Sequence, residues 1–273
     1  MFGRIFQLIK IGRKLASSGA IDTVDEIYNM PFTVKIFFDL IAIGSNKKNI
    51  NFAKKPGEKL CDALENMGTT FIKLGQFLAT RPDIIGEKLT DDLVKLQDKL
   101  PAFELHEAKR IIKNELGEKQ FKEILDISEP IAAASIAQVH IAKINFDGDV
   151  KEVAIKILRP DIEKLFNEEL DALMLFAYIV EGVVKKAKRL KLIEVVHLLR
   201  EITNIEMDLR FEAAAANELY ENTKNDKGFN VPRIYWNYTS KRVLTLDKVN
   251  GISIREHKIL KEEILTQKRL RKT

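Results

Sequence analysis

The alternation of apolar and polar residues is most regular between residues 129 and 158, where it indicates strands rather than helices. A first strand runs through Ile131, a second lies around Val139, and a third covers residues 152–158. The turn before the third strand contains Asp147-Gly148 between apolar, β-branched runs, which is typical of a hairpin. The pattern therefore predicts a small sheet.

The third predicted strand is apolar on both faces. Alternate side chains of a strand point to opposite sides. One face carries Val153, Ile155 and Ile157, and the other carries Ala154, Leu158 and Lys156. An ammonium group among apolar neighbours needs an anion, because an unpaired buried charge is unfavourable. Two interpretations remain open: an edge lysine that extends to water, or a lysine directed at a phosphate, as in the Val-Ala-Ile-Lys strand of protein kinases.

The loop before the second strand consists of small residues, namely Ala132, Ala133, Ala134 and Ser135. Protein kinases have glycines there, and their loop covers the phosphates of the nucleotide. Alanine adopts positive φ only at a cost, so this loop should be stiffer and less able to curl over a triphosphate. The alternative is a small-residue strand packed under a helix.

Apolar residues spaced three and four apart predict a helix over residues 58–80. They are Leu60, Leu64, Met67, Phe71, Leu74 and Leu78. Gly75 inside this pattern costs about 1 kcal/mol relative to alanine, which indicates the close approach of another backbone or a ligand. Lys73 and Gln76 are three positions apart and share a face, which by spacing alone would be a solvated one.

Two further helices are expected to follow. Arg81-Pro82-Asp83 ends the first helix, and Thr90 is expected to cap the next one, which stops before Pro101. The apolar run over residues 161–188 also has helical spacing, and we expect it to pack on the small sheet.

A single long helix is predicted over residues 193–221. On it, Glu206 and Glu212 border an apolar stripe and lie about 120° apart. If these carboxylates are buried they need cationic partners, for which Lys156 and Lys73 are candidates. The alternative is two solvated acids beside the stripe.

The positive charge is concentrated at the N-terminus. Formal net charge is +5, and residues 1–60 hold ten Lys and Arg against five Asp and Glu, so the remainder is balanced. This distribution indicates an anionic partner near the N-terminus. It does not favour nucleic acid, because outside the termini the charge balances and no stacking motif is present. One cysteine, Cys61, excludes an internal disulfide framework and a cysteine-based zinc site.

Residues 1–18 are basic, free of acidic residues and amphipathic. Such a segment lies on an anionic membrane surface, serves as a presequence, or forms an ordinary first helix over part of the core, and the sequence leaves these alternatives open. Residues 46–56 are polar and read as a linker. No apolar run approaches the length of about eighteen residues that spans a bilayer.

Several of these stretches, taken in order, resemble the UbiB family of atypical kinase-like proteins, also called aarF-domain kinases. Residues 71–76, followed by Thr80-Arg-Pro-Asp83 and by residues 96–101, resemble the Lys-x-Gly-Gln signature of that family. The alanine-rich loop and Val153-Ala-Ile-Lys156 match the same family in order and spacing. The resemblance covers roughly residues 50–254.

The resemblance implies an α+β fold: a protein-kinase-like N-terminal lobe, with a small antiparallel sheet plus helices, preceded by a helical Lys-x-Gly-Gln extension. The expected divisions are basic amphipathic helices over 1–50, the extension over 51–126, the small lobe over 127–254 and a basic tail over 255–273. Residues 231–236 and 242–252 read as two further strands, and the second resembles the strand that leads to the hinge between kinase lobes.

The resemblance also implies a nucleotide site for ATP or ADP with Mg²⁺. Lys156 would contact the phosphates, Glu212 would pair with it as the helix-C glutamate, and the loop Ala132, Ala133, Ala134 and Ser135 would lie beside the nucleotide. A lid would be formed by Lys73, Gln76, Glu206 and Asp208. In the family this lid occupies the protein-substrate site, which implies ATPase or small-molecule kinase behaviour in support of coenzyme Q (ubiquinone) biosynthesis.

Residues 1–273 contain neither a His-x-Asp-x-His-x-x-Asn loop nor an Asp-Phe-Gly motif, and none of the four histidines, His106, His140, His197 and His257, lies in such a loop. We therefore expect no catalytic residue and no metal ligand here, and no phosphoryl transfer by this polypeptide alone. The expectation is an N-terminal part of a split or truncated gene, with the C-terminal lobe absent or separately encoded.

A second hypothesis is a non-catalytic scaffold that binds a membrane, a lipid or a partner enzyme of the coenzyme Q pathway through the extension and the basic N-terminus. For either hypothesis the resemblance implies a peripheral location on the cytoplasmic face of the bacterial inner membrane, or on the matrix side in mitochondria.

Overall fold

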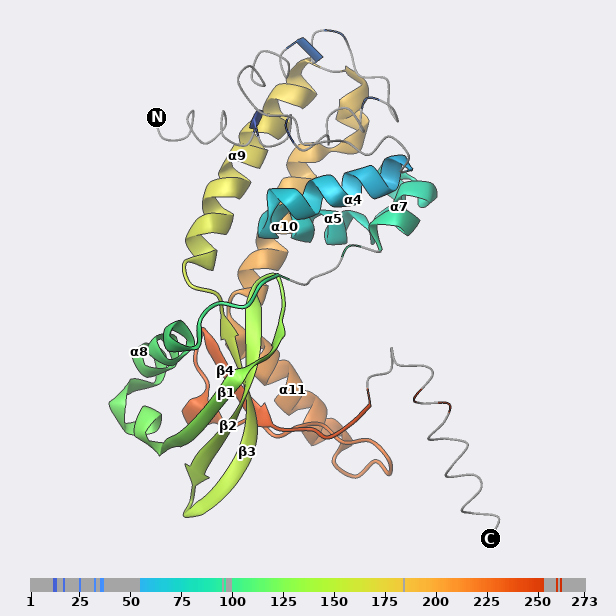
Figure 1. Ribbon diagram of the computed structural model, residues 1–273. Coiled ribbons are helices and arrows are strands. Elements are labelled where there is room, and N and C mark those ends of the chain that lie inside the picture. The colour runs from blue at the N-terminus through green and yellow to red at the C-terminus, as the bar shows by residue number, and fades with distance from the viewer. Residues whose placement is uncertain are drawn as a thin grey trace.

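The computed structural model describes residues 55–94, 96, 100–183 and 185–252, together with isolated positions nearer the two ends. The expectations for Met1–Ser18 and for the tail after residue 254 concern residues outside these ranges, isolated positions aside. The described part consists of a small sheet, a pair of long helices that extends away from it, and a group of shorter helices beside that pair (Figure 1).

Four antiparallel strands form the sheet in the order β1-β2-β3-β4. They are β1 Ile124–Ala133, β2 Ala137–Phe146, β3 Asp149–Leu158 and β4 Val243–Asp247. The hairpin expected between the second and third strands is present, and both of its central residues have positive φ, 54° at Asp147 and 87° at Gly148. This conformation matches the twist of the flanking strands.

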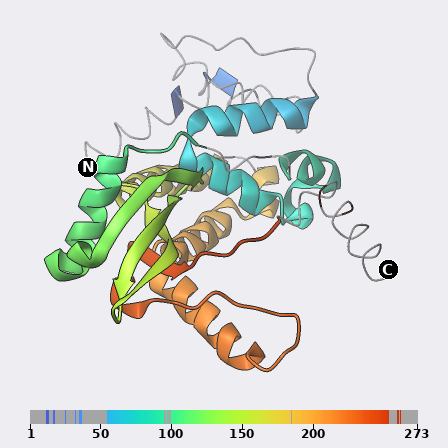
Figure 2. The same ribbon diagram turned by 60° about the horizontal axis from the view of Figure 1, so that its bottom comes forward.

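Helix α8, Leu105–Glu123, covers one face of the sheet (Figure 2). Its buried residues Ala108, Ile111 and Ile112 pack with the face of β3 that carries Val153, Ile155 and Ile157. This is the alternation expected from the sequence, and it leaves Lys156 on the opposite face.

Within residues 55–94 the extension forms α4 Pro56–Met67, α5 Thr69–Leu78, α6 Pro82–Ile85 and α7 Glu87–Leu93. Helix α8 also lies inside the range 51–126 expected for the extension, but it packs on the sheet. The prediction of one continuous helix over 58–80 is wrong, because Gly68 adopts φ 99° and separates α4 from α5. The capping prediction for Thr90 is also wrong. Thr90 lies inside α7, which begins after Gly86, and its hydroxyl donates to the Gly86 carbonyl at 3.0 Å.

Helices α9, Ile162–Val183, and α10, Leu192–Glu206, run side by side away from the sheet (Figure 1). A short 3-10 helix, η1 Lys185–Leu190, joins them. The expectation that the run over 161–188 packs on the sheet is therefore wrong for most of α9. Its buried residues share one core with α10, with the extension and with Leu158 at the end of β3, and its main neighbours are α10, η1 and α5.

The helix predicted over residues 193–221 is two helices, because α10 ends at Glu206 and α11 begins at Leu209 and runs to Thr223. Asp208 between them has an extended backbone, and its side chain accepts a hydrogen bond from Arg210 N at 3.1 Å. This is an N-cap. The angle expected between Glu206 and Glu212 on one helix therefore does not apply.

Of the two strands predicted over 231–252, only residues 243–247 form one, namely β4. The other segment pairs at a single bridge, Ile234 with Leu246, and then forms the 3-10 helix η2 Trp236–Tyr238. Pro232 in this segment has no backbone N–H to offer to a ladder, which favours this irregular path.

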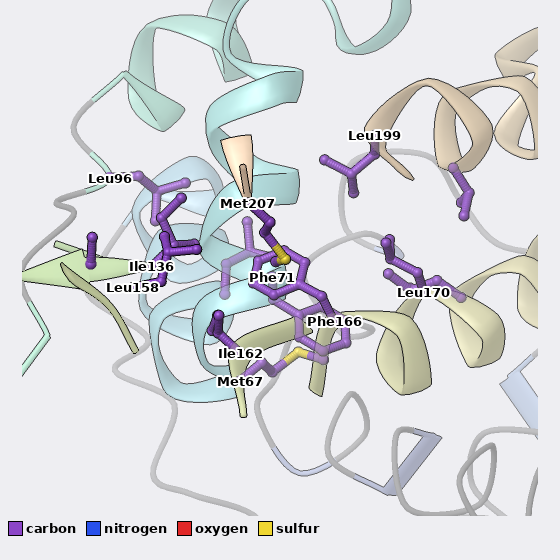
Figure 3. Close-up of a cluster of buried hydrophobic side chains, with 14 of the residues drawn as sticks. Met67, Phe71, Leu96, Ile136, Leu158, Ile162, Phe166, Leu170, Leu199 and Met207 are labelled. Carbon is purple, nitrogen blue, oxygen red and sulfur yellow. The ribbon is translucent and has the colours of Figure 1, made fainter. Parts of the chain in front are cut away.

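One hydrophobic core joins the extension, the helix pair and the end of the sheet (Figure 3). In it Met207, from the break between α10 and α11, lies beside Phe71 of α5, and Phe71 lies beside Phe166 of α9. The extension and the lobe thus share one hydrophobic core. Within the described residues, no helix has the length and apolar character needed to cross a bilayer.

Candidate functional site

A lysine and a glutamate meet on the face of the sheet opposite α8. Lys156 Nζ lies 2.7 Å and 3.0 Å from the two carboxylate oxygens of Glu212. The lysine comes from the middle of β3 and the glutamate from the first turn of α11, which the cap at Asp208 sets in place. The side chain of Lys156 is 27% exposed and that of Glu212 is 50% exposed. The pair is therefore open to a solute.

The strand register places the start of the alanine-rich loop on the same face of the sheet as Lys156. Ala132 of β1 pairs with Val139 of β2, Val139 pairs with Lys156 of β3, and Lys156 pairs with Leu244 of β4. Side chains directly opposite each other share a face of a sheet. Ala132 and Lys156 therefore face the same side, two strand spacings apart.

The loop itself is folded tightly. Ala134 N donates to Ala137 O at 2.8 Å, so this amide is not directed outward. Ala132 is exposed, Ala133 and Ala134 are half-buried, and Ser135 is fully buried. Of the four loop residues that the sequence singles out, Ala132 therefore offers the most surface to a ligand.

The second constellation links the extension to the helix pair. Lys73 Nζ on α5 lies 2.8 Å from Glu206 Oε2 at the end of α10. Gln76 lies on the same helix as Lys73 and is half-buried. Asp208 is directed elsewhere: its oxygens accept hydrogen bonds from Arg210 Nε at 2.9 Å and Nη2 at 2.6 Å. The bonds from Arg210 hold the pKa of Asp208 below its usual range.

Three polar residues near the site were not singled out from the sequence. Arg210 donates to the capping residue Asp208, and Arg159 donates to the carbonyl oxygen of Ala134. Gln138 accepts a hydrogen bond from the backbone N–H of Phe103. Arg159 and Gln138 form hydrogen bonds with backbone atoms. Every residue has such atoms, so the sequence carries no pattern that predicts these contacts. Only Arg210, two positions after a capping aspartate, carries a local signal.

The residues around Lys156 fit a phosphate group. A partly exposed ammonium with one carboxylate partner can accept a second anionic ligand, and the neighbouring alanines place no charge in its way. A bound nucleotide with Mg²⁺ would supply the phosphoryl group and the neutralising charge. No group of three or more potential metal-ligating side chains occurs in the part of the chain that the structure describes.

A kinase-type lysine–glutamate pair between β3 and α11, with a small-residue loop on the same face of the sheet two strands away, defines a kinase-like lobe. The family of ABC1 atypical kinase-like domains matches residues 95–273, and the chain belongs to this family. It is similar to the probable protein kinase UbiB of Marinobacter nauticus, 35% identical over 235 residues, and to that of Glaesserella parasuis, 38% identical over 201 residues.

These matches cover most of this chain and less than half of each relative. The first spans 86% of this chain and 42% of the relative, and the second spans 72% and 37%. The fold agrees with the family: a mixed α and β structure with a four-stranded antiparallel sheet, as expected for a kinase-like N-terminal lobe.

Proposed function

We propose that this chain forms the nucleotide-holding part of a UbiB-type atypical kinase or ATPase. The observation that carries the proposal is the contact of Lys156 Nζ with both carboxylate oxygens of Glu212, at 2.7 Å and 3.0 Å, on an open face of the sheet. In this arrangement Glu212 orients the ammonium group, and the ammonium group binds the phosphates of ATP or ADP. Ala132, Ala133, Ala134 and Ser135 form the loop beside them.

We further propose that α5 and the end of α10 act as the lid. Lys73 and Glu206 hold the two elements together through their ion pair, and Gln76 lies on the same helix as Lys73. Asp208 acts on the site indirectly, because as the N-cap of α11 it fixes the start of the helix that carries Glu212. In this reading the lid restricts the space next to the nucleotide, which favours hydrolysis or a small substrate over a protein substrate.

The experiment that tests the nucleotide site is calorimetric titration of the purified chain with ADP and ATP, with and without Mg²⁺. Lys156→Ala should weaken binding at least about tenfold, because a charge-assisted contact is lost. Lys151→Ala is the matched control, since this lysine lies on the same strand and is exposed. A folded chain that binds no nucleotide, or that loses as much affinity in the control as in Lys156→Ala, would refute the site.

The wider role is part of the same proposal. We propose a role in ubiquinone biosynthesis, which similarity to proteins named UbiB favours. The proposed cofactor is Mg²⁺-nucleotide, and the proposed partners are pathway enzymes or a separately supplied C-terminal lobe. Catalysis would then require the His-x-Asp and Asp-Phe-Gly elements of that second lobe. Mixing this chain with such a lobe and measuring Mg²⁺-dependent ATP hydrolysis would test this requirement.

A second candidate function is peripheral binding to anionic membrane, which the basic, acid-free residues 1–18 favour. It would place the protein at the cytoplasmic face of the inner membrane. Sedimentation with vesicles containing an anionic phospholipid, compared with neutral vesicles, tests it. Binding that is lost on deletion of residues 1–18 supports this function, and equal binding to both vesicle types contradicts it.

A further inference from the structure

The side chain of Arg159, just after β3, is placed between two segments that are distant in sequence. Its Nε and Nη2 donate to the carbonyl oxygen of Ala134 at 3.0 Å and 2.9 Å. Its Nη1 donates to the carbonyl oxygen of Pro101 at 2.9 Å. One guanidinium group thus joins the alanine-rich loop to the segment that leads from the extension into α8.

The backbone of Arg159 is itself held from two sides. Its N–H donates to Ile136 O at 2.9 Å, and its carbonyl oxygen accepts a hydrogen bond from Arg242 Nη2 at 3.0 Å. These two hydrogen bonds fix the backbone position from which the side chain of Arg159 extends. A planar guanidinium with several donors can satisfy two carbonyl oxygens in fixed directions, which a lysine ammonium on a flexible stem does less well.

A neighbouring side chain holds the same connecting segment. Gln138, which is 1% exposed, accepts a hydrogen bond from Phe103 N at 2.9 Å and donates to Phe103 O at 3.1 Å. Its Nε2 also lies 2.9 Å from His140 Nε2. Residues 101–103 are thus fastened to the end of the sheet at two points, next to the loop.

We infer that Arg159 is a positioning residue, which holds the alanine-rich loop folded back on itself and makes this loop move as one unit with residues 101–103, the segment that leads from the extension into α8. The inference rests on the proposed nucleotide site for its consequence, but the positioning itself can be observed without nucleotide. In the folded-back loop the N–H of Ala134 donates to the carbonyl oxygen of Ala137 and the carbonyl oxygen of Ala134 accepts from Arg159, so this N–H is not available to a phosphate. Release of the loop would free the N–H.

Arg159→Lys is the informative variant, because it keeps the charge and removes the two-directional contact. The matched control is Arg200→Lys, an arginine paired with Asp171 between α9 and α10. Amide hydrogen exchange without nucleotide should become about tenfold faster at residues 133–137 and 102–104 in Arg159→Lys, with the rest of the chain unchanged. The control should leave these two segments at the wild-type rate.

The second readout is the ratio of ATP to ADP affinity, measured by calorimetry. It should change severalfold in favour of ATP in Arg159→Lys, because a released loop can turn an amide toward a third phosphate. A general loss of stability would lower both affinities and leave the ratio constant.

Wild-type exchange rates at both segments in Arg159→Lys, or faster exchange throughout the chain, would overturn the positioning role. An unchanged affinity ratio beside locally faster exchange would overturn the link to the nucleotide. If the wild-type chain binds no nucleotide, the proposed function fails on its own, and the exchange measurement still decides the role of Arg159.

Discussion

Lys73 Nζ on α5 and Glu206 Oε2 at the end of α10 lie 2.8 Å apart, which joins the helical extension to the helix that leads into α11. The side chain of Lys73 is 17% exposed and that of Glu206 is 36% exposed, so the pair is only partly screened by water. This contact and the hydrophobic core around Phe71 hold the extension against the site.

Exchanging the two charges tests this contact. Lys73→Glu and Glu206→Lys should each destabilise the chain, because each places like charges together, and the double exchange should recover most of the loss. We expect a coupling of about 0.5–1 kcal/mol from denaturant unfolding. The exposed pair Lys191 and Glu194 serves as the control, with a smaller coupling. Additive effects at Lys73 and Glu206 would contradict the role of this pair.

Gly75 provides a test of the packing of α5. A Cβ atom there would lie 2.3 Å from Leu96 Cδ1 and 2.8 Å from Leu64 Cδ1, and both leucines belong to the core. Gly75→Ala should therefore destabilise the chain by about 1–3 kcal/mol, although alanine favours helices. Gly182→Ala in α9 is the matched control, because a Cβ meets nothing within 4 Å there, and it should be neutral or stabilising. Stabilisation by both changes would show that α5 is not closely packed.

Asp208 should make stability depend on acid pH. The hydrogen bonds from Arg210 lower its pKa in the fold, so its contribution is present above the ordinary value of about 4 and is lost as the pH falls through the lowered folded-state value. Asp208→Asn keeps a good capping residue and removes the charge. The difference in unfolding free energy between wild type and Asp208→Asn should shrink as the pH falls below about 4. A difference that stays constant with pH would contradict this account.

His140 predicts a second pH effect, nearer neutrality. It is fully buried, and burial lowers its pKa in the fold. Nδ1 lies 2.8 Å from the carbonyl of Ser128, which only accepts, so Nδ1 carries the proton and Nε2 accepts from Gln138. Stability should be constant above the ordinary pKa of about 6.5 and fall below it, since only the unfolded chain binds the extra proton readily.

Thermal unfolding across this range, in wild type and in His140→Gln, checks the prediction. The variant should lose the decline between about pH 7 and 5.5. His197→Gln, at an exposed position on α10, should keep it. If stability still declines between these pH values in His140→Gln, groups other than His140 cause the decline.

The sheet could be predicted from sequence because its signals are local. The alternation through Val153, Ile155 and Ile157 and the Asp147-Gly148 turn are properties of neighbouring residues, and the structure has both. The helix breaks at Gly68 and Asp208 were missed for the opposite reason. Apolar spacing continues across each break, so only the backbone preference of glycine and the capping preference of aspartate mark them.

The site could be predicted only with the help of the family resemblance. Periodicity made Glu206 and Glu212 candidates for pairing with Lys73 and Lys156, but it did not decide which pairs form, because pairing depends on how distant elements pack. The role of Arg159 gave no sequence signal at all, since its partners are the backbone carbonyls of Ala134 and Pro101.

The most direct test of the central claim is to locate the nucleotide's phosphates on the chain chemically. An acyl phosphate derivative of ATP transfers its acyl group to a lysine amine that lies next to the bound phosphates, and peptide mass spectrometry then identifies that lysine. We predict acylation of Lys156 that excess ADP suppresses, while Lys143 and Lys151 on the same sheet react at a rate that ADP does not change. Acylation of Lys156 that is absent or indifferent to ADP, in a chain shown to be folded, would contradict the nucleotide site.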